Sequence, residues 1–143
     1  MSRLVVVDAS VALKWVVTEP GSEEAAALLV EMAEGTTTLV APEHMVGEVG
    51  NGLRKRVAQG ALGVDEAVHA LEAVASLGLG LVGGTDRWVR CLTAAMQWGL
   101  TTYDAVYVLL ALDLDAELVT ADTRLLDAGL RLSLPVLPLA TSA

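Results

Sequence analysis

Apolar and polar positions alternate in two kinds of pattern along this chain. Residues 4–7 are consecutive apolar residues of high strand preference, and an unbroken run of this kind is typical of a strand that is covered on both faces. We predict this first strand at residues 3–7, further strands at 36–41, 79–82 and 117–120, and an edge strand at 135–139.

The segments between these strands have helical spacing. One buried helix face is marked by apolar residues at every fourth position, namely Met45, Val49, Leu53 and Val57. This helix is predicted at residues 44–59, and others at 9–17, 22–34, 64–77, 85–98, 101–113 and 122–128. Ser22 is the expected N-cap of the second helix, and Gly129 is expected to end the last. Alternating strands and helices predict one α/β domain over residues 1–143, with a central parallel sheet of four to five strands.

Composition adds few constraints. Hydrophobic residues make up 54% of the 143 residues, yet no stretch approaches the roughly 18 apolar residues of a membrane span. The apolar residues before Asp8 are too few for a secretory signal, so we expect a cytoplasmic protein. The single cysteine, Cys91, lies among apolar residues and is expected in the core. The formal net charge of −9 has the wrong sign for holding nucleic acid by phosphate neutralisation alone and favours cations or basic partners.

Acidic residues follow two of the predicted strands. Asp8 and Asp122 each stand between a strand and a helix, and parallel strands place their carboxyl ends at the same ligand-binding edge of a sheet. Each is also a favoured N-cap residue, so capping is the alternative role for both. Glu48 lies one step from the apolar stripe of its helix, where an ordinary solvated side chain is the alternative. Asp104 lies in the first turn of a very apolar helix, and its spacing from Thr101 also fits a capping box.

These four carboxylates would bring several negative charges close together if they meet in the folded protein. Crowded carboxylates repel one another unless a cation lies between them. A set of oxygen ligands without His or Cys favours a hard ion, Mg²⁺ or Mn²⁺, and such ions bind substrate phosphates. The expected chemistry is therefore phosphodiester hydrolysis.

Four short blocks contain these residues: Val7-Asp8-Ala-Ser10, Glu48-Val-Gly-Asn51, Thr102-Tyr-Asp104-Ala and Val119-Thr120-Ala-Asp122. In order and spacing they resemble the signature blocks of PIN-domain ribonucleases, particularly the VapC toxins of bacterial toxin–antitoxin systems. The resemblance implies a three-layer α/β/α PIN-like domain with a central parallel sheet and an acidic pocket. Gly50 and Gly52 depart from the usual helix-forming residues of the second block.

By match of motif, the resemblance assigns catalysis and the binding of Mg²⁺ or Mn²⁺ to Asp8, Glu48, Asp104 and Asp122. It assigns supporting polar roles to Ser10, Asn51 and Thr120. The implied function is that of a metal-dependent endoribonuclease, the toxin of a type II toxin–antitoxin pair. The implied partners are an RNA substrate, a cognate antitoxin protein and a second copy of the chain, with no membrane.

Other roles stay open at this point. Arg54, Lys55 and Arg56 continue the helix that bears Glu48 and are either RNA contacts or a solvated face. Residues 15–17 are either dimer contacts or core. A phosphoacceptor receiver domain also places acidic residues at strand ends, but it needs a late lysine, and no lysine follows Lys55. A catalytically inactive PIN-like protein that acts by binding RNA or a protein partner is the alternative function.

Overall fold

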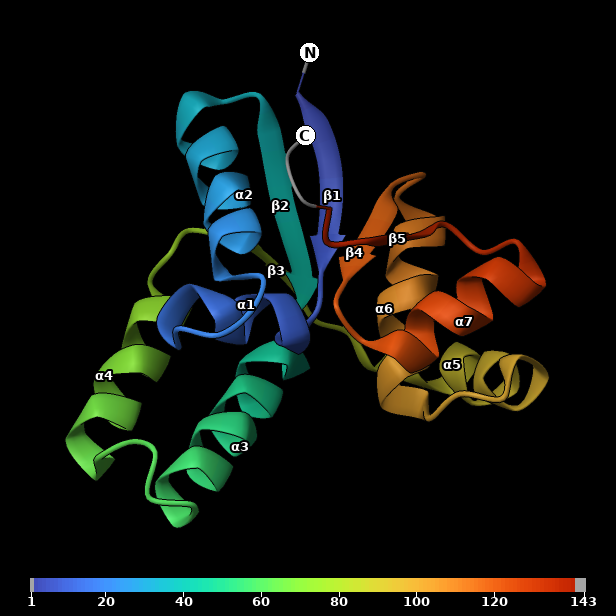
Figure 1. The fold of residues 1–143 in the computed structure, drawn as a ribbon. Helices are drawn as coiled ribbons and strands as arrows, with labels where there is room; N and C mark the ends of the chain where they lie inside the picture. Colours follow the sequence, from blue (N-terminus) through green and yellow to red (C-terminus); the bar gives the residue numbers. More distant parts are fainter. Residues whose placement is uncertain (1, 141–143) are drawn as a thin grey trace.

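A computed structural model describes residues 2–140, and within them the chain forms a five-stranded sheet and seven helices (Figure 1). The strands are β1 (Arg3–Val7), β2 (Thr37–Pro42), β3 (Gly80–Val82), β4 (Glu117–Thr120) and β5 (Val136–Pro138). The helices are α1 (Ala9–Val16), α2 (Ser22–Glu34), α3 (His44–Ala58), α4 (Val64–Ala75), α5 (Thr85–Trp98), α6 (Thr102–Asp113) and α7 (Thr123–Leu132).

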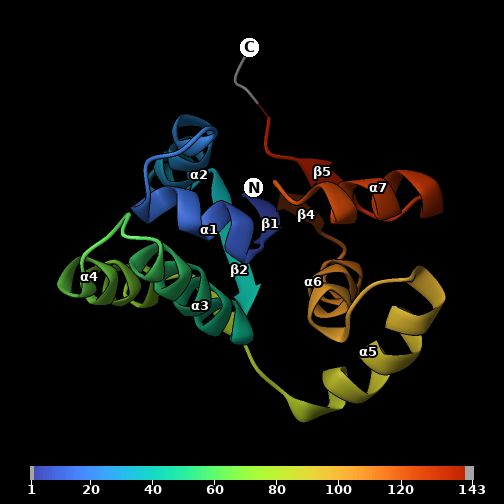
Figure 2. The same cartoon turned by 60° about the horizontal axis from the view of Figure 1, so that its bottom comes forward.

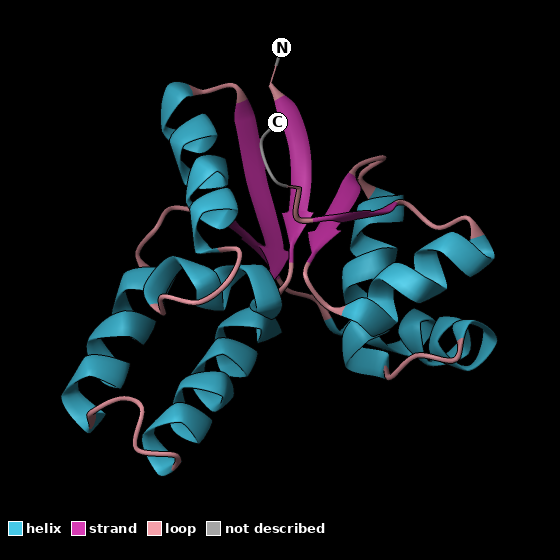
Figure 3. Ribbon diagram, in the orientation of Figure 1, coloured by secondary structure: helices cyan, strands magenta, loops and turns pink. Residues whose placement is uncertain are grey.

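The strands pair in parallel in the order β3-β2-β1-β4-β5, and Figure 3 shows the arrows of β1, β2 and β4 pointing the same way. The central strand β1 pairs with β2 on one side and with β4 on the other. Val5, Val6 and Val7 are completely buried because both faces of β1 are covered, as its unbroken apolar run predicts. The predicted parallel sheet is confirmed.

Helices cover both faces of the sheet and make three layers. Helices α1 to α4 lie on one side of the sheet, and α5 and α6 lie on the other (Figure 2). Helix α1 packs against both α2 and α3, and the α3–α4 hairpin extends beyond the carboxyl ends of the strands (Figure 1). The expected α/β/α architecture is therefore confirmed.

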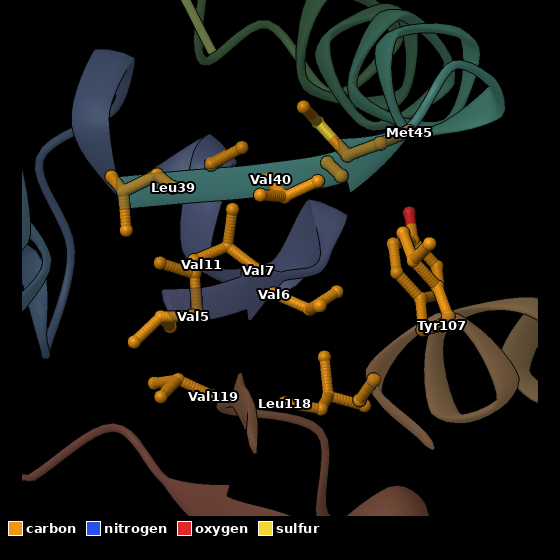
Figure 4. Packing of buried hydrophobic residues seen from close by; sticks show 14 of the residues in the cluster. Val5, Val6, Val7, Val11, Leu39, Val40, Met45, Tyr107, Leu118 and Val119 are labelled. Atoms are coloured by element: carbon orange, nitrogen blue, oxygen red, sulfur yellow. The ribbon is translucent and has the colours of Figure 1, made fainter. Parts of the chain in front are cut away.

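Helix α6 is apolar on all sides because it is covered twice. Tyr107, Val108 and Leu110 join the main core against the sheet, where Figure 4 shows Tyr107 beside the valines of β1. Val106 and Leu109 face α5 in a second cluster that contains Cys91. Burial of each large apolar side chain contributes about 1.5–3 kcal/mol, so this helix is firmly held against the sheet. The core position of Cys91 is confirmed.

Two predictions about the ends of helices are wrong. Helix α7 continues through Gly129 to Leu132, because this glycine serves packing: a Cβ atom there would lie 2.7 Å from Cβ of Val136 in β5. Ser22 is the first residue of α2, and the N-cap is Gly21 in the left-handed conformation (φ 94°). The Ser22 hydroxyl instead donates to the carbonyl of Val17, which closes the preceding turn.

The remaining predicted elements agree with the structure within one or two residues at each end. Val57, the last residue of the predicted apolar stripe of α3, is only partly buried, whereas the three before it are buried. No helix among residues 2–140 is long and apolar enough to span a lipid bilayer.

Candidate active site

The site lies where the order of strands reverses. The chain proceeds outward from β1 through β2 to β3 and then returns to the other side of β1 to form β4. Ligand crevices of open α/β sheets lie at such a switch point, at the carboxyl ends of the strands. Asp8 directly follows β1, and Asp122 follows β4 after one intervening residue. The fold therefore brings these two predicted residues to one place.

Asp8 is buried, with 3% of its surface exposed, and both of its carboxylate oxygens are engaged. Ser10 Oγ donates to Oδ1 at 2.6 Å, and the Thr120 hydroxyl donates to Oδ2. The backbone N–H of Val11 also donates to Oδ1, at 3.3 Å, so Asp8 does cap α1. Capping and participation in the polar site are thus compatible roles of the same side chain.

The hydroxyls of Ser10 and Thr120 connect Asp8 to the chain after β4. Ser10 Oγ accepts from the Ala121 N–H at 2.9 Å, and Thr120 Oγ1 accepts from the Asp122 N–H at the same distance. Both hydroxyls therefore orient Asp8 and fix the start of α7 relative to β1. Asn51 Oδ1 accepts from Arg54 Nε, and Asn51 does not contact Asp8 through a hydrogen bond in the described part of the chain, so its supporting role stays a prediction.

Burial raises the pKa of Asp8 from 3.8 to about 6. The hydrogen bonds from Ser10, Thr120 and Val11 act in the opposite direction but do not compensate. The nearby charge of Asp122 raises the pKa of Asp8 further. The ionised form of Asp8 is therefore disfavoured, and a nearby cation would stabilise it.

Asp104 and Asp122 face the same guanidinium group. The Arg124 side chain lies 3.8 Å from Oδ2 of Asp104 and 3.7 Å from Oδ2 of Asp122. Burial raises the pKa of Asp104, and the charges of Asp122 and Glu48 also raise it, whereas Arg124 lowers it. Asp122 caps α7 through the Arg124 N–H, and Thr101 caps α6 through the Asp104 N–H. No sequence pattern predicted Arg124 as a member of this site.

Glu48 is half-buried, in agreement with the predicted boundary position on α3. Its Oε1 accepts from the Tyr107 hydroxyl at 2.6 Å and lies 3.2 Å from Nε2 of His44. Burial by itself would raise the pKa of Glu48, but the hydrogen bonds of His44 and Tyr107 outweigh it and lower the pKa. Sequence reasoning missed both partners. The available signals were the four-residue spacing of His44 from Glu48 and the position of Tyr107 one turn after Asp104.

A cavity of about 650 Å³ opens beside these residues. Its lining includes Ser10, Glu48, Asn51, Tyr103 and Asp122. Asp8 lies behind this lining, and Asp104 opens onto a neighbouring cavity of about 350 Å³ together with Arg124. Of the four predicted carboxylates, Glu48 and Asp122 thus line the larger cavity, Asp104 lines the smaller one, and Asp8 lines neither.

Only two of the three predicted RNA contacts face the cavity. Lys55 and Arg56 line the cavity, whereas Arg54 borders an apolar groove between α3 and α4. Arg56 is also bound to Glu19 Oε2 at 2.8 Å. Lys55 is therefore the candidate among the three whose charge faces the cavity without an ion pair in the described part of the chain.

The donor set fits a hydrated hard cation rather than a closed metal cage. Within residues 2–140, no three His, Cys, Asp or Glu side chains meet closely enough to hold a metal ion between them. Mg²⁺ usually keeps several waters and needs only one or two carboxylates. The charge of Asp122 raises the pKa values of Asp8 and Asp104, and the charge of Glu48 also raises that of Asp104, so negative charges lie close together here. An oxygen-only site with this excess charge suits Mg²⁺ or Mn²⁺.

Comparison with known proteins gives a family. The PIN domain model matches residues 5–130. Ribonuclease VapC1 of Mycobacterium tuberculosis is 35% identical over 85 residues, which cover 59% of this chain and 63% of that protein. The chain thus matches somewhat less than two thirds of the length of this curated relative.

Solved structures share the fold. PAE2754 of Pyrobaculum aerophilum has a TM-score of 0.66 and 26% identity, covering 88% of this chain and 79% of that one. The M. tuberculosis toxin VapC20, which cleaves the sarcin-ricin loop, has a TM-score of 0.69 and 15% identity, covering 87% and 95%. Rickettsia felis VapBC2, bound to a DNA fragment from its promoter, has a TM-score of 0.65 and 15% identity, covering 94% and 98%. The match over residues 5–130 and the shared architecture show that the chain belongs to the PIN domain family.

Proposed function

We propose that this protein is a Mg²⁺- or Mn²⁺-dependent endoribonuclease and the toxin of a type II toxin–antitoxin pair. The observation that carries the proposal is the meeting of Asp8 and Asp122 at the switch point of the sheet, with Glu48 and Asp104 within electrostatic reach. Its membership of the PIN domain family and its likeness to Ribonuclease VapC1 support the same activity.

In the proposed mechanism the protein positions carboxylates and the metal supplies charge. Asp8, Glu48, Asp104 and Asp122 would hold a hydrated ion, some of them through its water molecules. When bound, the ion would supply positive charge for the phosphate and would lower the pKa of a water molecule. The hydroxyls of Ser10 and Thr120 hold Asp8 in position. The hydroxyl of Tyr107 donates to Glu48, which helps to lower the pKa of Glu48 and favours its ionised form. Lys55 is placed at the cavity to attract a phosphate group.

Cleavage of a single-stranded RNA by the purified protein tests this proposal. We expect cleavage with Mn²⁺ or Mg²⁺, none with EDTA, and loss of cleavage in Asp8→Asn. A matched acid-to-amide control is Asp65→Asn, at an exposed position in the first turn of α4 that lines neither cavity. Equal cleavage by wild type and Asp8→Asn would reject the mechanism. A pure wild-type protein that binds RNA without cutting it would favour the inactive, binding alternative.

We also propose a basic antitoxin as the partner. Two of the structural neighbours are VapBC assemblies, and the net charge of −9 suits a partner of opposite charge. Coexpression with the product of the neighbouring gene should yield a stable complex with a small basic protein, and separate elution of the two would count against it. Homodimerisation is proposed from the family and is tested by sedimentation. Residues 15–17 are half-buried against the core, so the dimer contact is not assigned to them.

A further inference from the structure

Aromatic residues are scarce in this chain and gather beside the acidic cavity. The sequence contains three Trp, two Tyr and no Phe. Three of these five, Trp88, Tyr103 and Tyr107, surround the imidazole ring of His44. Their ring centroids lie 5.1, 5.8 and 4.8 Å from that of His44, respectively. Three of the five Trp and Tyr residues are therefore placed at one edge of the proposed active site.

Tyr103 differs from the other rings because it faces outward. It is 57% exposed, whereas Tyr107 is 1% exposed and Trp88 is partly buried. Tyr103 also lines the same cavity as Glu48 and Asp122. Core packing accounts for Tyr107, but it does not account for an exposed ring at the cavity wall.

The ring of Tyr103 is held in place although it is exposed. Trp88 packs against it in a T-shaped arrangement, with centroids 5.5 Å apart and an interplanar angle of 77°. The Tyr103 carbonyl also lies 3.2 Å from Nε2 of His44, which ties its backbone to α3. A ring that is fixed before binding loses little conformational entropy when a ligand stacks on it.

Charge alone gives this site little affinity for RNA. Acidic residues outnumber basic ones by 18 to 9. Near the cavity, Arg56 is paired with Glu19, and Arg124 lies between Asp104 and Asp122, which leaves Lys55 as the one cavity-lining cation without an ion pair in the described part of the chain. Stacking of a base on an aromatic ring needs no net positive charge, because every base has a π face. An exposed, fixed tyrosine is thus the feature of this wall that suits a nucleobase.

We propose that Tyr103, supported by Trp88 and His44, is a stacking site for one unpaired base of the RNA, next to the phosphate that is cut. This inference rests on the proposed function, since the base belongs to the same substrate. It specifies a single-stranded or looped RNA, because a base can stack on a side chain only when it is free of its own duplex. It also predicts that a substantial part of the binding is insensitive to salt.

Binding of a fluorescently labelled single-stranded RNA of about eight nucleotides, measured by anisotropy in EDTA, tests the site without catalysis. We expect Tyr103→Ala to weaken binding by about fivefold or more, while Tyr103→Phe keeps wild-type affinity. Val89→Ala, at an apolar position on α5 that is 77% exposed, is the control and should bind as wild type. Melting temperatures of all variants show that each is folded.

RNAs with a single abasic nucleotide at successive positions identify the stacked base. With one of these RNAs, the wild type should bind more weakly than with the intact RNA, by the same factor that Tyr103→Ala loses on the intact RNA. Tyr103→Ala should bind that abasic RNA and the intact RNA equally well. Wild-type affinity in Tyr103→Ala, or no binding of RNA by wild type, would overturn the stacking site. The stacking site would also be overturned if Tyr103→Ala weakened binding of the antitoxin but not of RNA, because this surface would then be a protein contact. Binding that depends on Tyr103 in a protein that cuts no RNA would reject the nuclease but keep the stacking site.

Discussion

Replacement of Asp8 by Asn should change how the stability of the protein depends on pH. Burial raises the pKa of Asp8 from 3.8 to about 6, so the folded state binds the Asp8 proton more tightly than the unfolded state does. This contribution to stability is fully present below the unfolded pKa and is lost as the pH rises through the folded pKa. The complete loss is about 3 kcal/mol, at about 1.36 kcal/mol for each pH unit.

Between about pH 4.5 and pH 7.5, the titration of Asp8 should remove about 2 kcal/mol of unfolding free energy from the wild type. Asn does not titrate, so Asp8→Asn should gain about 2 kcal/mol relative to the wild type over the same range. The amide also alters the hydrogen bonds with Ser10 and Thr120, and this adds an offset between the two curves. The offset does not change with pH, so the slope isolates the carboxylate.

Urea denaturation in EDTA, followed by circular dichroism at several pH values, measures both curves. The chelator matters because a bound cation would favour the ionised carboxylate and hide the effect. Asp65→Asn is the control, and its curve should run parallel to that of the wild type. Parallel curves for wild type and Asp8→Asn would show that Asp8 ionises without penalty, and the argument from burial would then be wrong.

Two further substitutions test the packing and the site. Gly129→Ala should destabilise the protein by about 1–3 kcal/mol in urea denaturation, because its Cβ would meet that of Val136 at 2.7 Å. Gly47→Ala, a helical position with no atom within 4 Å of the added Cβ, should instead stabilise it by up to about 1 kcal/mol, and equal effects would contradict the packing argument. Tyr107→Phe removes the 2.6 Å hydrogen bond that helps to lower the pKa of Glu48. The acid limb of the cleavage pH profile should move to higher pH and kcat/KM should fall about fivefold, whereas an unmoved limb would exclude Glu48 as the titrating group.

Local patterns were sufficient for most of the fold. The bounds of β1 and β4 follow from short apolar runs that end at polar residues, and the C-terminal ends of α2 and α5 follow from Gly35 and Gly99. Gly129 shows where local patterns fail. The same residue that commonly ends a helix is required here inside one, for the close approach of a strand that comes later in the chain.

The acidic residues of the candidate site and the hydroxyl partners of Asp8 were predicted, but the partners of the other three carboxylates were not. Strand ends and helix turns have fixed positions in an α/β fold, so Asp8 and Asp122 could be placed from order alone. Arg124 could not, because a long side chain two residues after a cap has no sequence pattern that shows where its head group lies. The run of Arg54 to Arg56 was treated as a unit, although successive residues of a helix point about 100° apart.

The hydrogen bonds of Asp8 also determine when during synthesis the site can form. Its hydroxyl partner Thr120 is 112 residues away in the sequence, and β1 lacks one of its two neighbouring strands until residues 117–120 have been made. A nascent chain still attached to the ribosome at that point holds three of the four carboxylates in an unfinished sheet. A chain that stops before residue 117 should therefore lack both β4 and the hydroxyl that holds Asp8, and the polar site should form only once this strand has been made.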